Sequence, residues 1–457
     1  MEEDLFVKAP VSKAYFKFTL PLVCSLIVGL IYNMVDTYFI GHTGDANQVA
    51  AVSLCGPIFG AVNAIGGILS IGGSTAISRL FGEKNDEKAK SIGSFCFYGL
   101  LLIGFIVSAF MLMFSNSILK ILGVDEMTFK FALSYYRYIA LGVPFIMFSA
   151  GAPSILRSEG LTKEVMFGSI LGTVLNIILN PIFIIWMNKG AAGAAIATVI
   201  ANILTDVFCV YIILKKSRKF SLSIKRCSID FNTLKNILAI GIPGSLQSAM
   251  QSFTIVVINV SLYVYGNNAI ASMGIAMKLI MIIVMIIVGF SFGMQPLIGY
   301  NYGAKNVKRL KEILRFSLIF EIALTTVMSA ILFIGANPIM RCFMDNDNVV
   351  ASGSTILRLQ VITIPLLTII FICTVVFQAA GKAVSALILS LSHQGILFVP
   401  VILILKSVFG YYGVICAQPV TDVLTVILTI VLFYITFNRL FRNENNNVIN
   451  SSDANYN

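Results

Sequence analysis

The sequence predicts an all-α integral membrane protein with twelve transmembrane helices, arranged as two six-helix bundles related by a parallel repeat. Of its 457 residues, 58% are hydrophobic and only 12% are charged, and the mean hydropathy is +0.91. Soluble domains have roughly a quarter of their residues charged, so this chain has too much apolar surface for a water-soluble globule. A membrane-spanning helix needs about 20 apolar residues. The length therefore accommodates twelve spans with short loops and no sizeable soluble catalytic domain.

Long apolar runs separated by polar breaks define the expected spans. The first six lie at about 15–40, 49–80, 91–114, 131–155, 165–188 and 191–214, and the second six at about 237–265, 269–300, 314–336, 355–378, 384–405 and 413–437. The expected domains follow from these spans: an N-terminal bundle at 1–219, a C-terminal bundle at 220–440, and a polar tail at 441–457 that we expect to be disordered.

The basic residues are distributed unevenly between the two sides of the predicted membrane. With a cytoplasmic N-terminus, 24 of the 32 lysines and arginines fall on the cytoplasmic side, 7 fall on the outer side, and Lys278 lies within a span. Cytoplasmic loops of membrane proteins carry such an excess, so both termini are predicted to be cytoplasmic. The net charge of +11 is thereby explained by topology, and no nucleic-acid partner is expected.

The two halves of the chain resemble each other at a nearly constant offset of about 221 residues. Because each half has an even number of spans, the halves have the same orientation, with a pseudo-two-fold axis along the membrane normal. Such repeats are typical of transporters whose site lies within or between the two bundles. The matched residues are Pro21 with Pro243, Gly72 with Gly293, Gly82 with Gly303, Pro144 with Pro365, Gly160 with Gly381, Gly190 with Gly410, and Gly193 with Gly413.

Asp36, in GLIYNMVDTYFIG, is the only acid deep within the early helices of the first half. It lies five residues from Gly41, which places it roughly 8 Å below the outer end of its helix. A charge at membrane depth costs about 2.5 to 3.5 kcal/mol on insertion scales, so the default hypothesis is a functional role. The alternative is a carboxylate close enough to the headgroups to be hydrated.

The fifth and sixth expected helices each carry a polar pair spaced four residues apart, which places both members on one helix face. These pairs are Asn176 with Asn180 and Thr198 with Asn202. Asn180 and Thr198 both lie about 12 Å below the outer surface, near the depth of Asp36. We therefore predict a cation-coupling site formed by Asp36, Asn176, Asn180 and Thr198. Interhelical hydrogen bonding is the alternative, and for Asn176 and Asn202 it explains the residues equally well.

Several further residues are candidates for the lining of a substrate cavity. For the tyrosines the alternative is a core or interfacial role, and for the lysine it is an extended side chain that reaches the interface. Three other acids, Asp206, Glu321 and Asp422, lie nearer the cytoplasmic helix ends, where we expect them to be solvated or paired. The cavity candidates are Tyr32, Tyr135, Asn202, Gln247, Gln251 and Lys278.

The sequence has no signature of catalysis or nucleotide binding. It contains two histidines and has no HExxH, no GxxxxGK[ST] and no evident intramembrane Ser/His/Asp grouping. We therefore expect neither an enzyme nor an ATP-driven pump, and no cofactor or metal apart from H⁺ or Na⁺ as coupling ion. A single asymmetric acid favours alternating access over a passive channel. The eight cysteines show no metal-ligand spacing and are expected to be small core residues.

A series of ordered motifs resembles the multidrug and toxin extrusion (MATE) family, in particular its bacterial branch with DinF-like and MepA-like members. The resemblance covers residues 14–437. The motifs are LPLVCSLIVGLIYNMVDTYFIG, SRLFGEKNDEKAK, LRSEG, VLNIILNP, GAAGAAIATVIAN, IGIPGSLQS, PLIGYNYGAKNVKRLKE and FQAAGKA.

The resemblance implies a monomeric exporter in the bacterial plasma membrane that moves amphipathic, often cationic, organic compounds against H⁺ or Na⁺ entry. Asp36 matches the acid of the family's cation site, Asn176 and Asn180 fall on its fifth-helix motif, and the polar residues around them match the surroundings of that site. The family often has Asp where this chain has Asn180, so the site here keeps one carboxylate. The alternatives are a flippase for a lipid-linked saccharide precursor and a non-transporting membrane scaffold or receptor.

Overall fold

The computed structural model describes residues 2–43, 45–343 and 346–453, and every regular element in these ranges is a helix. Ten helices are long and apolar enough to cross a membrane. An eleventh span is formed by α14 (Asp347–Val361) and α15 (Ile364–Ala379), which are bent by 46° at a short break. The 32-residue helix α9 (Phe231–Leu262) covers the remaining expected span. The predicted all-α membrane fold is therefore confirmed.

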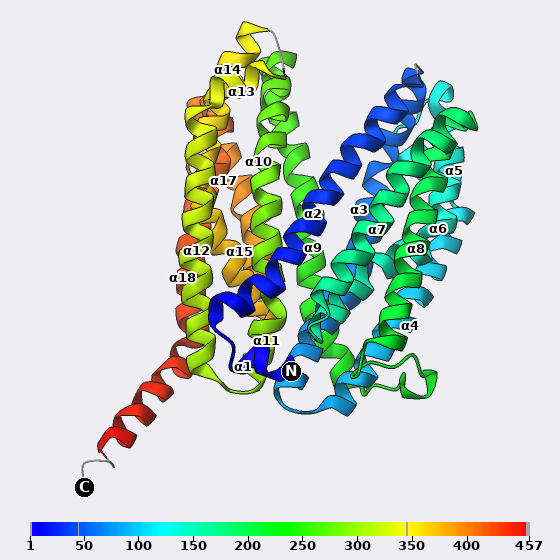
Figure 1. Cartoon of the computed structure of the whole chain (residues 1–457). Helices are drawn as coiled ribbons and strands as arrows, with labels where there is room; N and C mark the ends of the chain where they lie inside the picture. The colour runs from blue at the N-terminus through cyan, green and yellow to red at the C-terminus, as the bar shows by residue number, and fades with distance from the viewer. Residues whose placement is uncertain (1, 44, 344–345, 454–457) are drawn as a thin grey trace. The chain divides into compact units, whose positions relative to one another are not determined.

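The other helices follow the predicted order of spans (Figure 1). In the first half they are α1 (Glu2–Val7), α2 (Val11–Gly41), α3 (Ala46–Gly82), α4 (Asp86–Met113), α5 (Ser115–Ile121), α6 (Glu126–Ser158), α7 (Thr162–Pro181), η1 (Ile182–Trp186) and α8 (Gly190–Lys215). After η2 (Ile224–Arg226) and α9 come η3 (Tyr263–Tyr265), α10 (Asn267–Gly293), α11 (Gln295–Gly303), α12 (Val307–Ile334), α13 (Ala336–Arg341), α16 (Ala383–Leu391), η4 (Ser392–Ile396), α17 (Phe398–Phe409) and α18 (Tyr411–Asp453).

The internal repeat extends to the backbone of the turns. Lys84 and Lys305 both have positive φ, 58° and 55°, although neither is glycine. The next residue in each turn, Asn85 or Asn306, caps the following helix. Its side-chain oxygen accepts a hydrogen bond from the backbone N–H three residues later, that of Lys88 or Arg309. The two turns are thus built in the same way at equivalent places, which supports the parallel repeat predicted from proline and glycine positions.

The chain forms two compact units that do not follow the boundary expected after residue 219. One unit comprises residues 20–245 and the other residues 1–19 together with 246–457. The boundaries fall inside α2 and α9, each within two residues of a helix proline, Pro21 or Pro243. The first turns of α2 therefore belong to the unit that is formed mainly by the second half of the sequence, and the first turns of α9 belong to the unit formed by the first half. We call residues 20–245 the N-terminal unit, and residues 1–19 with 246–457 the C-terminal unit.

Two glycines of the repeat allow these first turns to pack closely within their units. A Cβ on Gly72 of α3 would lie 2.1 Å from the carbonyl oxygen of Ile237 in α9. A Cβ on Gly293, at the end of α10, would lie 2.6 Å from the Cα of Thr19 in α2. Both approaches are too close for any side chain. The equivalent glycines predicted from the repeat thus perform equivalent packing roles in the two units.

We expect Gly72→Ala to lower the free energy of unfolding by about 1–3 kcal/mol, because the added methyl group overpacks the contact with α9. The matched control is Gly60→Ala in the same helix, where a Cβ would meet nothing within 4 Å. The measurement is reversible unfolding of the purified protein in mixed micelles by titration with a denaturing detergent. Equal stability of the two variants would contradict the close packing of α3 against α9.

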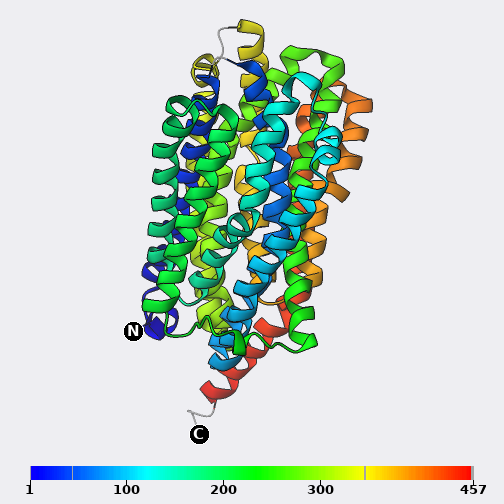
Figure 2. The same ribbon diagram turned by 90° about the vertical axis from the view of Figure 1, so that its right-hand side faces the viewer.

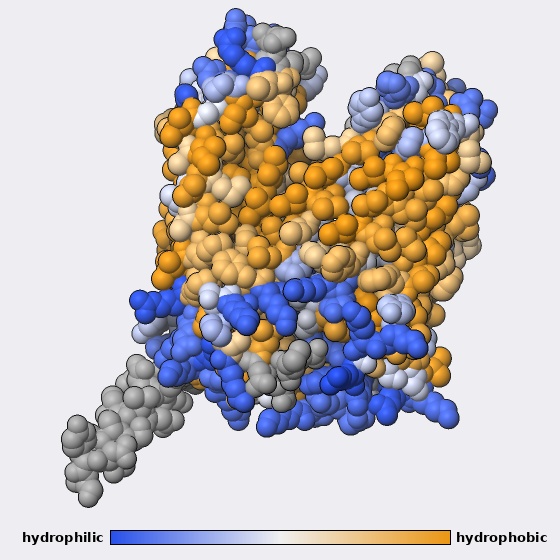
Figure 3. Space-filling view, viewed as in Figure 1, coloured by the Kyte–Doolittle hydropathy of each residue, from blue (hydrophilic) through white to orange (hydrophobic). Residues whose placement is uncertain are grey.

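The outer surfaces of the helices are suited to lipid. Apolar side chains cover the middle of the helices and hydrophilic side chains gather at their ends (Figure 3). In α4 and α12, large apolar residues such as Phe105, Ile106, Ile319 and Ile331 are exposed. The helices of each unit run side by side along a common direction in both ribbon views (Figures 1 and 2). This arrangement is that of a multi-pass membrane protein.

Two expectations about the sequence are corrected by the structure. Four of the eight cysteines are buried, two are half-buried, and Cys24 and Cys342 are exposed. Cys24 lies on α2, and an apolar run on a lipid-facing helix need not point into the core. The tail expected to be disordered is helical up to Asp453, as a continuation of α18, and residues 454–457 lie outside the described part of the chain. The tail adjoins α18, so its helix needs no new nucleation step, which is the costly part of helix formation.

Candidate functional site

A cavity of about 610 Å³ lies within the N-terminal unit. It is bounded by five helices, α2, α3, α6, α7 and α8, and its lining is a mixture of polar and aromatic side chains. The polar and aromatic residues that line it are Tyr32, Asp36, Ser53, Phe59, Asn63, Tyr135, Ser149, Ser169, Thr173, Asn176, Thr198, Asn202 and Thr205.

Asp36 is joined to the two asparagines of α7 by hydrogen bonds. Asn180 Nδ2 donates to the Asp36 carboxylate at 3.0 Å and to Asn176 Oδ1 at 2.9 Å. Asn176 Nδ2 in turn lies 3.4 Å from Thr198 Oγ1 on α8. Three helices thus bring the four predicted coupling residues into one connected network. The structure supports the predicted arrangement, and the role in ion coupling stays a prediction.

Thr198 connects this network to the rest of the cavity wall. Its hydroxyl lies 3.1 Å from the Tyr32 hydroxyl, and its backbone carbonyl accepts a hydrogen bond from Asn202 Nδ2 at 2.8 Å. Ser149 of α6 donates to Asn202 Oδ1. A continuous series of polar contacts therefore leads from Asp36 along α8, and the prediction that Tyr32, Tyr135 and Asn202 line a cavity is supported by their positions.

The sequence around Pro181 positions the α7 asparagines. Proline lacks a backbone N–H, so it cannot close the α-helical hydrogen bond to the carbonyl of Ile177. The chain passes from α7 directly into the π-helix η1 at this point. Inserted π-turns occur frequently at functional sites. Asn180 lies immediately before this change and is completely buried behind Asp36, while Asn176, one turn earlier, reaches the cavity.

The cavity has one acidic side chain, Asp36, and no lysine or arginine among the described residues that line it. The structure shows no ion pair to Asp36 within the described ranges; its polar contact there is Asn180. Asn180 Oδ1 is buried without a hydrogen-bond partner in the described chain. A carboxylate and an amide oxygen at this position are the hard oxygen donors suited to a proton or a small cation.

Three predicted cavity residues do not belong to this site. Gln247, Gln251 and Lys278 lie in the C-terminal unit, outside the residues that line the cavity, and Gln251 and Lys278 are exposed. α10 buries Ala276, Leu279 and Ile283, which leaves Lys278 on another face of the helix. They are therefore not part of the cavity that contains Asp36, and their role in lining a substrate cavity stays a prediction.

Sequence reasoning also missed residues that do line the cavity. Asn63 of α3 and Ser149 of α6 are polar residues in the middle of expected spans, which is the signal that singled out Asn176 and Asn202. Neither has a polar neighbour one turn away on the same face, so the paired spacing used for α7 and α8 did not reveal them.

The three acids expected to be solvated at helix ends are all buried. Asp206, Glu321 and Asp422 are 7%, 1% and 3% exposed. Glu321 accepts hydrogen bonds from Tyr15 and Ser291, and Asp422 contacts His393, whereas neither carboxylate oxygen of Asp206 has a hydrogen-bond partner in the described chain. Of the two expected outcomes, solvation does not hold for any of the three acids, because these long helices carry them farther into the bundle than the apolar runs indicate, whereas pairing holds for Asp422, which lies 3.0 Å from His393.

A duplicated helical membrane fold with a polar cavity inside one unit is that of a multi-pass membrane transport protein. A family model described as MatE matches the chain twice, at residues 21–182 and 243–404. The chain belongs to the MatE family. The two matches coincide with the internal repeat, which the sequence predicted from its offset.

Relatives and solved structures agree with this assignment. Multidrug export protein MepA of Staphylococcus aureus (strain NCTC 8325 / PS 47) is 33% identical over 437 residues, which are 95% of this chain and 96% of the relative. Multidrug export protein MepA of Staphylococcus haemolyticus (strain JCSC1435) is 30% identical over 441 residues, 96% of this chain and 97% of the relative. The crystal structure of MATE in the bent conformation is similar in fold, with a TM-score of 0.90 and 24% identity, and covers 97% of this chain and 98% of its own.

Proposed function

We propose that the protein is a secondary active multidrug exporter that antiports amphipathic, often cationic, organic compounds against H⁺ or Na⁺ by alternating access. The family and the full-length similarity to relatives named as multidrug export proteins support the class of activity. The coupling and the cargo are inferred from the cavity. We further propose the plasma membrane as its location and a cytoplasmic position for both termini, as the distribution of basic residues indicates.

The single observation that carries the proposal is one carboxylate, Asp36, in the wall of a drug-sized cavity that has no described basic residue. Cavities of about 300–1,000 Å³ accommodate small organic ligands. Phe59, Tyr32 and Tyr135 offer aromatic surface, and aromatic rings attract organic cations. A carboxylate without a counter-ion in such surroundings is stabilised by any cation that reaches it, whether a proton, Na⁺ or a cationic drug.

Competition between the ion and the cargo for this carboxylate would couple the inward flux of H⁺ or Na⁺ to the outward flux of the cargo. When H⁺ or Na⁺ occupies Asp36, the cavity loses the negative charge that holds a cationic cargo, and when the ion leaves, the charge returns. Entry of one unit charge at 100 mV supplies about 2.3 kcal/mol. That free energy sustains nearly a fifty-fold gradient of an uncharged cargo, at about 1.4 kcal/mol for each factor of ten. One carboxylate is therefore sufficient for useful export.

The same charge distribution argues against the lipid-linked saccharide flippase. A cavity that holds a pyrophosphate headgroup needs several lysine or arginine side chains, since these are the residues that recognise phosphate. The described lining of the N-terminal cavity has none, and Lys278 lies in the other unit. A scaffold or receptor would leave the Asp36 network without a role in transport.

We expect a fluorescent organic cation such as ethidium to leave proteoliposomes against its own gradient when an inward ΔpH or an inward Na⁺ gradient is imposed. Imposing the two gradients separately identifies the coupling ion. An ionophore that collapses the active gradient should stop accumulation of the cation outside. Equal movement with every ionic gradient collapsed would contradict antiport and leave facilitated diffusion.

A further inference from the structure

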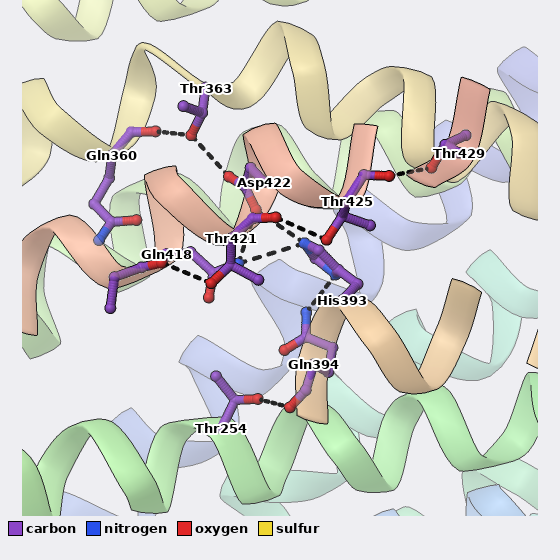
Figure 4. Close-up of polar contacts among 11 residues, drawn as sticks. Thr254, Gln360, Thr363, His393, Gln394, Gln418, Thr421, Asp422, Thr425 and Thr429 are labelled. Carbon is purple, nitrogen blue, oxygen red and sulfur yellow. Dashed lines mark hydrogen bonds and ion pairs between the residues drawn. The ribbon is translucent and has the colours of Figure 1, made fainter. Parts of the chain in front are cut away.

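The C-terminal unit contains a second buried polar cluster that the Asp36 network does not include (Figure 4). We define the His393 cluster as His393 and Gln394 of η4, Gln418 and Asp422 of α18, and Thr363 between α14 and α15. The side chains of His393 and Asp422 are each 5% exposed. η4 lies between α16 and α17, near the middle of the span Ala383–Phe409, so the cluster is at membrane depth.

The hydrogen bonds of the cluster determine where the imidazole proton lies. Gln394 Nε2 is 3.0 Å from His393 Nδ1, and an amide nitrogen can only donate, so Nδ1 accepts. The ring hydrogen is therefore on Nε2, which donates to Asp422 Oδ1 at 3.0 Å. Thr363 Oγ1 donates to Asp422 Oδ2 at 2.7 Å, and Gln418 Nε2 donates to Oδ1 at 2.9 Å. Gln418 Nε2 also lies 3.4 Å from His393 Nε2, but that nitrogen cannot accept while it carries the ring hydrogen, so the Gln418 amide bonds to the carboxylate. This arrangement is a neutral imidazole facing a carboxylate.

The carboxylate of Asp422 has no cationic partner in the described part of the chain. The elements that pack against α18 or η4, or that bond to the cluster, are α9, α12, α14, α15, α16 and α17, and α16 has no ionisable side chain. No ionisable side chain of the other elements is bonded to His393 or Asp422 among the described contacts. These side chains are Lys235 of α9, Lys308, Arg309, Lys311, Glu312, Arg315 and Glu321 of α12, Asp347 and Arg358 of α14, Cys373 of α15, Lys406 of α17, and Tyr411, Tyr412, Cys416 and Tyr434 of α18 up to residue 438.

With a neutral imidazole, the buried cluster carries the single negative charge of the Asp422 carboxylate, and one added positive charge would neutralise it. Rotation of the Gln394 amide by half a turn would present its oxygen to Nδ1, and that nitrogen could then carry a second ring hydrogen. The result is an imidazolium paired with a carboxylate, which has no net charge. Gln394 is held by its backbone, because Thr254 Oγ1 of α9 donates to its carbonyl oxygen at 2.7 Å, so the side-chain amide can turn without moving the helix.

The chemistry of the cluster selects a proton over a metal cation. The groups that surround the Asp422 carboxylate are donors, namely an imidazole N–H, an amide N–H and a hydroxyl. Na⁺ needs several oxygen acceptors directed at one point, as other hard cations do. The nearby hydroxyls of Thr421 and Thr425 donate to backbone carbonyls of their own helix. In the described chain, no group of three or more His, Cys, Asp or Glu residues could hold a metal ion.

We propose that His393 and Asp422 form a proton-binding site in the C-terminal unit, in which a proton taken from water adds to His393 Nδ1 as the Gln394 amide turns. No other bond is made or broken, and release returns the same proton to water. The backbone of the site is a π-helix, a form that is rare and recurs at functional positions. The site stands apart from the proposed role of Asp36, since its residues all lie in the other unit.

The site corresponds only in part to a repeat copy of the Asp36 network. At the repeat offset of about 221 residues, the second half has Val257 and Ile258 in place of Asp36, and Val399 to Val401 in place of Asn180. At the offset of 220 that relates Gly190 and Gly193 to Gly410 and Gly413, Gln418 and Asp422 of α18 fall at the positions of Thr198 and Asn202 of α8. Duplication therefore accounts for a polar pair at this place on α18, whereas the acid at position 422 and the histidine are specific to the second half.

The chain contains two histidines, which makes a direct test possible. In the full-length His42→Gln protein, His393 is the only histidine, and its cluster is intact; His42 is an exposed residue in the turn after α2. With ¹⁵N-labelled imidazole in lipid nanodiscs, we expect the NMR spectrum of a neutral Nε2–H ring to become that of an imidazolium when the buffer is acidified from about pH 8 to about pH 5.

Variants in the His42→Gln background separate this site from the rest of the molecule. Asp422→Asn keeps the shape and removes the charge, so the imidazolium should not form over this range. Glu321→Gln, at another buried acid of the same unit, and Asp36→Asn, at the candidate coupling site, should each leave the transition unchanged. The transition should also be the same in NaCl and in KCl.

Four results would overturn the proposal. They are a His393 ring that stays neutral down to about pH 5, an Asp422→Asn protein that titrates like its parent, an Asp36→Asn protein that loses the transition, and displacement of the bound proton by Na⁺. The first measurement needs no substitution within the cluster, so it is valid even where Asp422→Asn fails to fold. Failure of ion-driven efflux would leave all of these measurements unaffected.

Discussion

Asp36→Asn is expected to abolish accumulation of an organic cation against its gradient, while the protein still folds and inserts. Asparagine has nearly the shape of aspartate, and its amide oxygen can still accept the hydrogen bond that Asn180 donates to the carboxylate. What it lacks is the negative charge that binds H⁺ or Na⁺. One-for-one exchange of a monovalent organic cation for H⁺ or Na⁺ moves no net charge, so the parent can sustain a cation gradient up to the size of the imposed ion gradient, and this gradient should fall to none in the variant. Dye efflux from proteoliposomes with an imposed ion gradient measures the change.

The matched control is Asp206→Asn, the same substitution at another buried acid of the N-terminal unit. Asp206 lies on α8, as Thr198 does, but it does not line the cavity. We expect this variant to retain ion-driven efflux. Transport at the parental rate by Asp36→Asn would remove Asp36 from the mechanism, and equal loss in both variants would show that any buried acid of the unit is required rather than the one in the cavity.

The fold was predictable from the sequence because membrane spans and repeats leave local signals. Each span is an uninterrupted apolar run, and the turns of the repeat are marked by prolines, glycines and the paired residues Asn85 and Asn306. What the sequence did not show is that the compact units exchange the first turns of α2 and α9. That exchange depends on which neighbour a helix contacts, and the close approaches at Gly72 and Gly293 are visible only in three dimensions.

The Asp36 network was predictable because depth and helical spacing are both local properties. Counting residues from the helix ends placed Asp36, Asn180 and Thr198 at a similar level, and the structure joins Asp36 to Asn180 directly and to Thr198 through Asn176. The His393 cluster was missed by the sequence analysis. Its members are separated by up to 59 residues between Thr363 and Asp422 and come from different helices, so no local pattern joins them.

Asn180→Asp tests whether Asn180 shares the site of Asp36, and we expect it to change the cation dependence of transport. In the parent, Asn180 Nδ2 lies 3.0 Å from the Asp36 carboxylate. Two carboxylates at such a distance cannot both be ionised without a cation between them. They titrate as a coupled pair, and the variant binds one more unit of positive charge than the parent when fully occupied.

If both charges move with each cargo molecule, the driving force at 100 mV doubles to about 4.6 kcal/mol. The limiting gradient of an uncharged cargo then rises from nearly fifty-fold to roughly two thousand-fold. If one proton stays bound between the carboxylates, the stoichiometry is unchanged but the pH at which efflux is half-maximal shifts. Efflux measured across a matrix of imposed pH and Na⁺ gradients distinguishes these outcomes.

Asn63→Asp is the matched control, because Asn63 lines the same cavity and makes no hydrogen bond with Asp36 in the described part of the chain. A pH and Na⁺ profile of Asn180→Asp identical to that of the parent would show that positions 36 and 180 do not share a cation, although they are in contact.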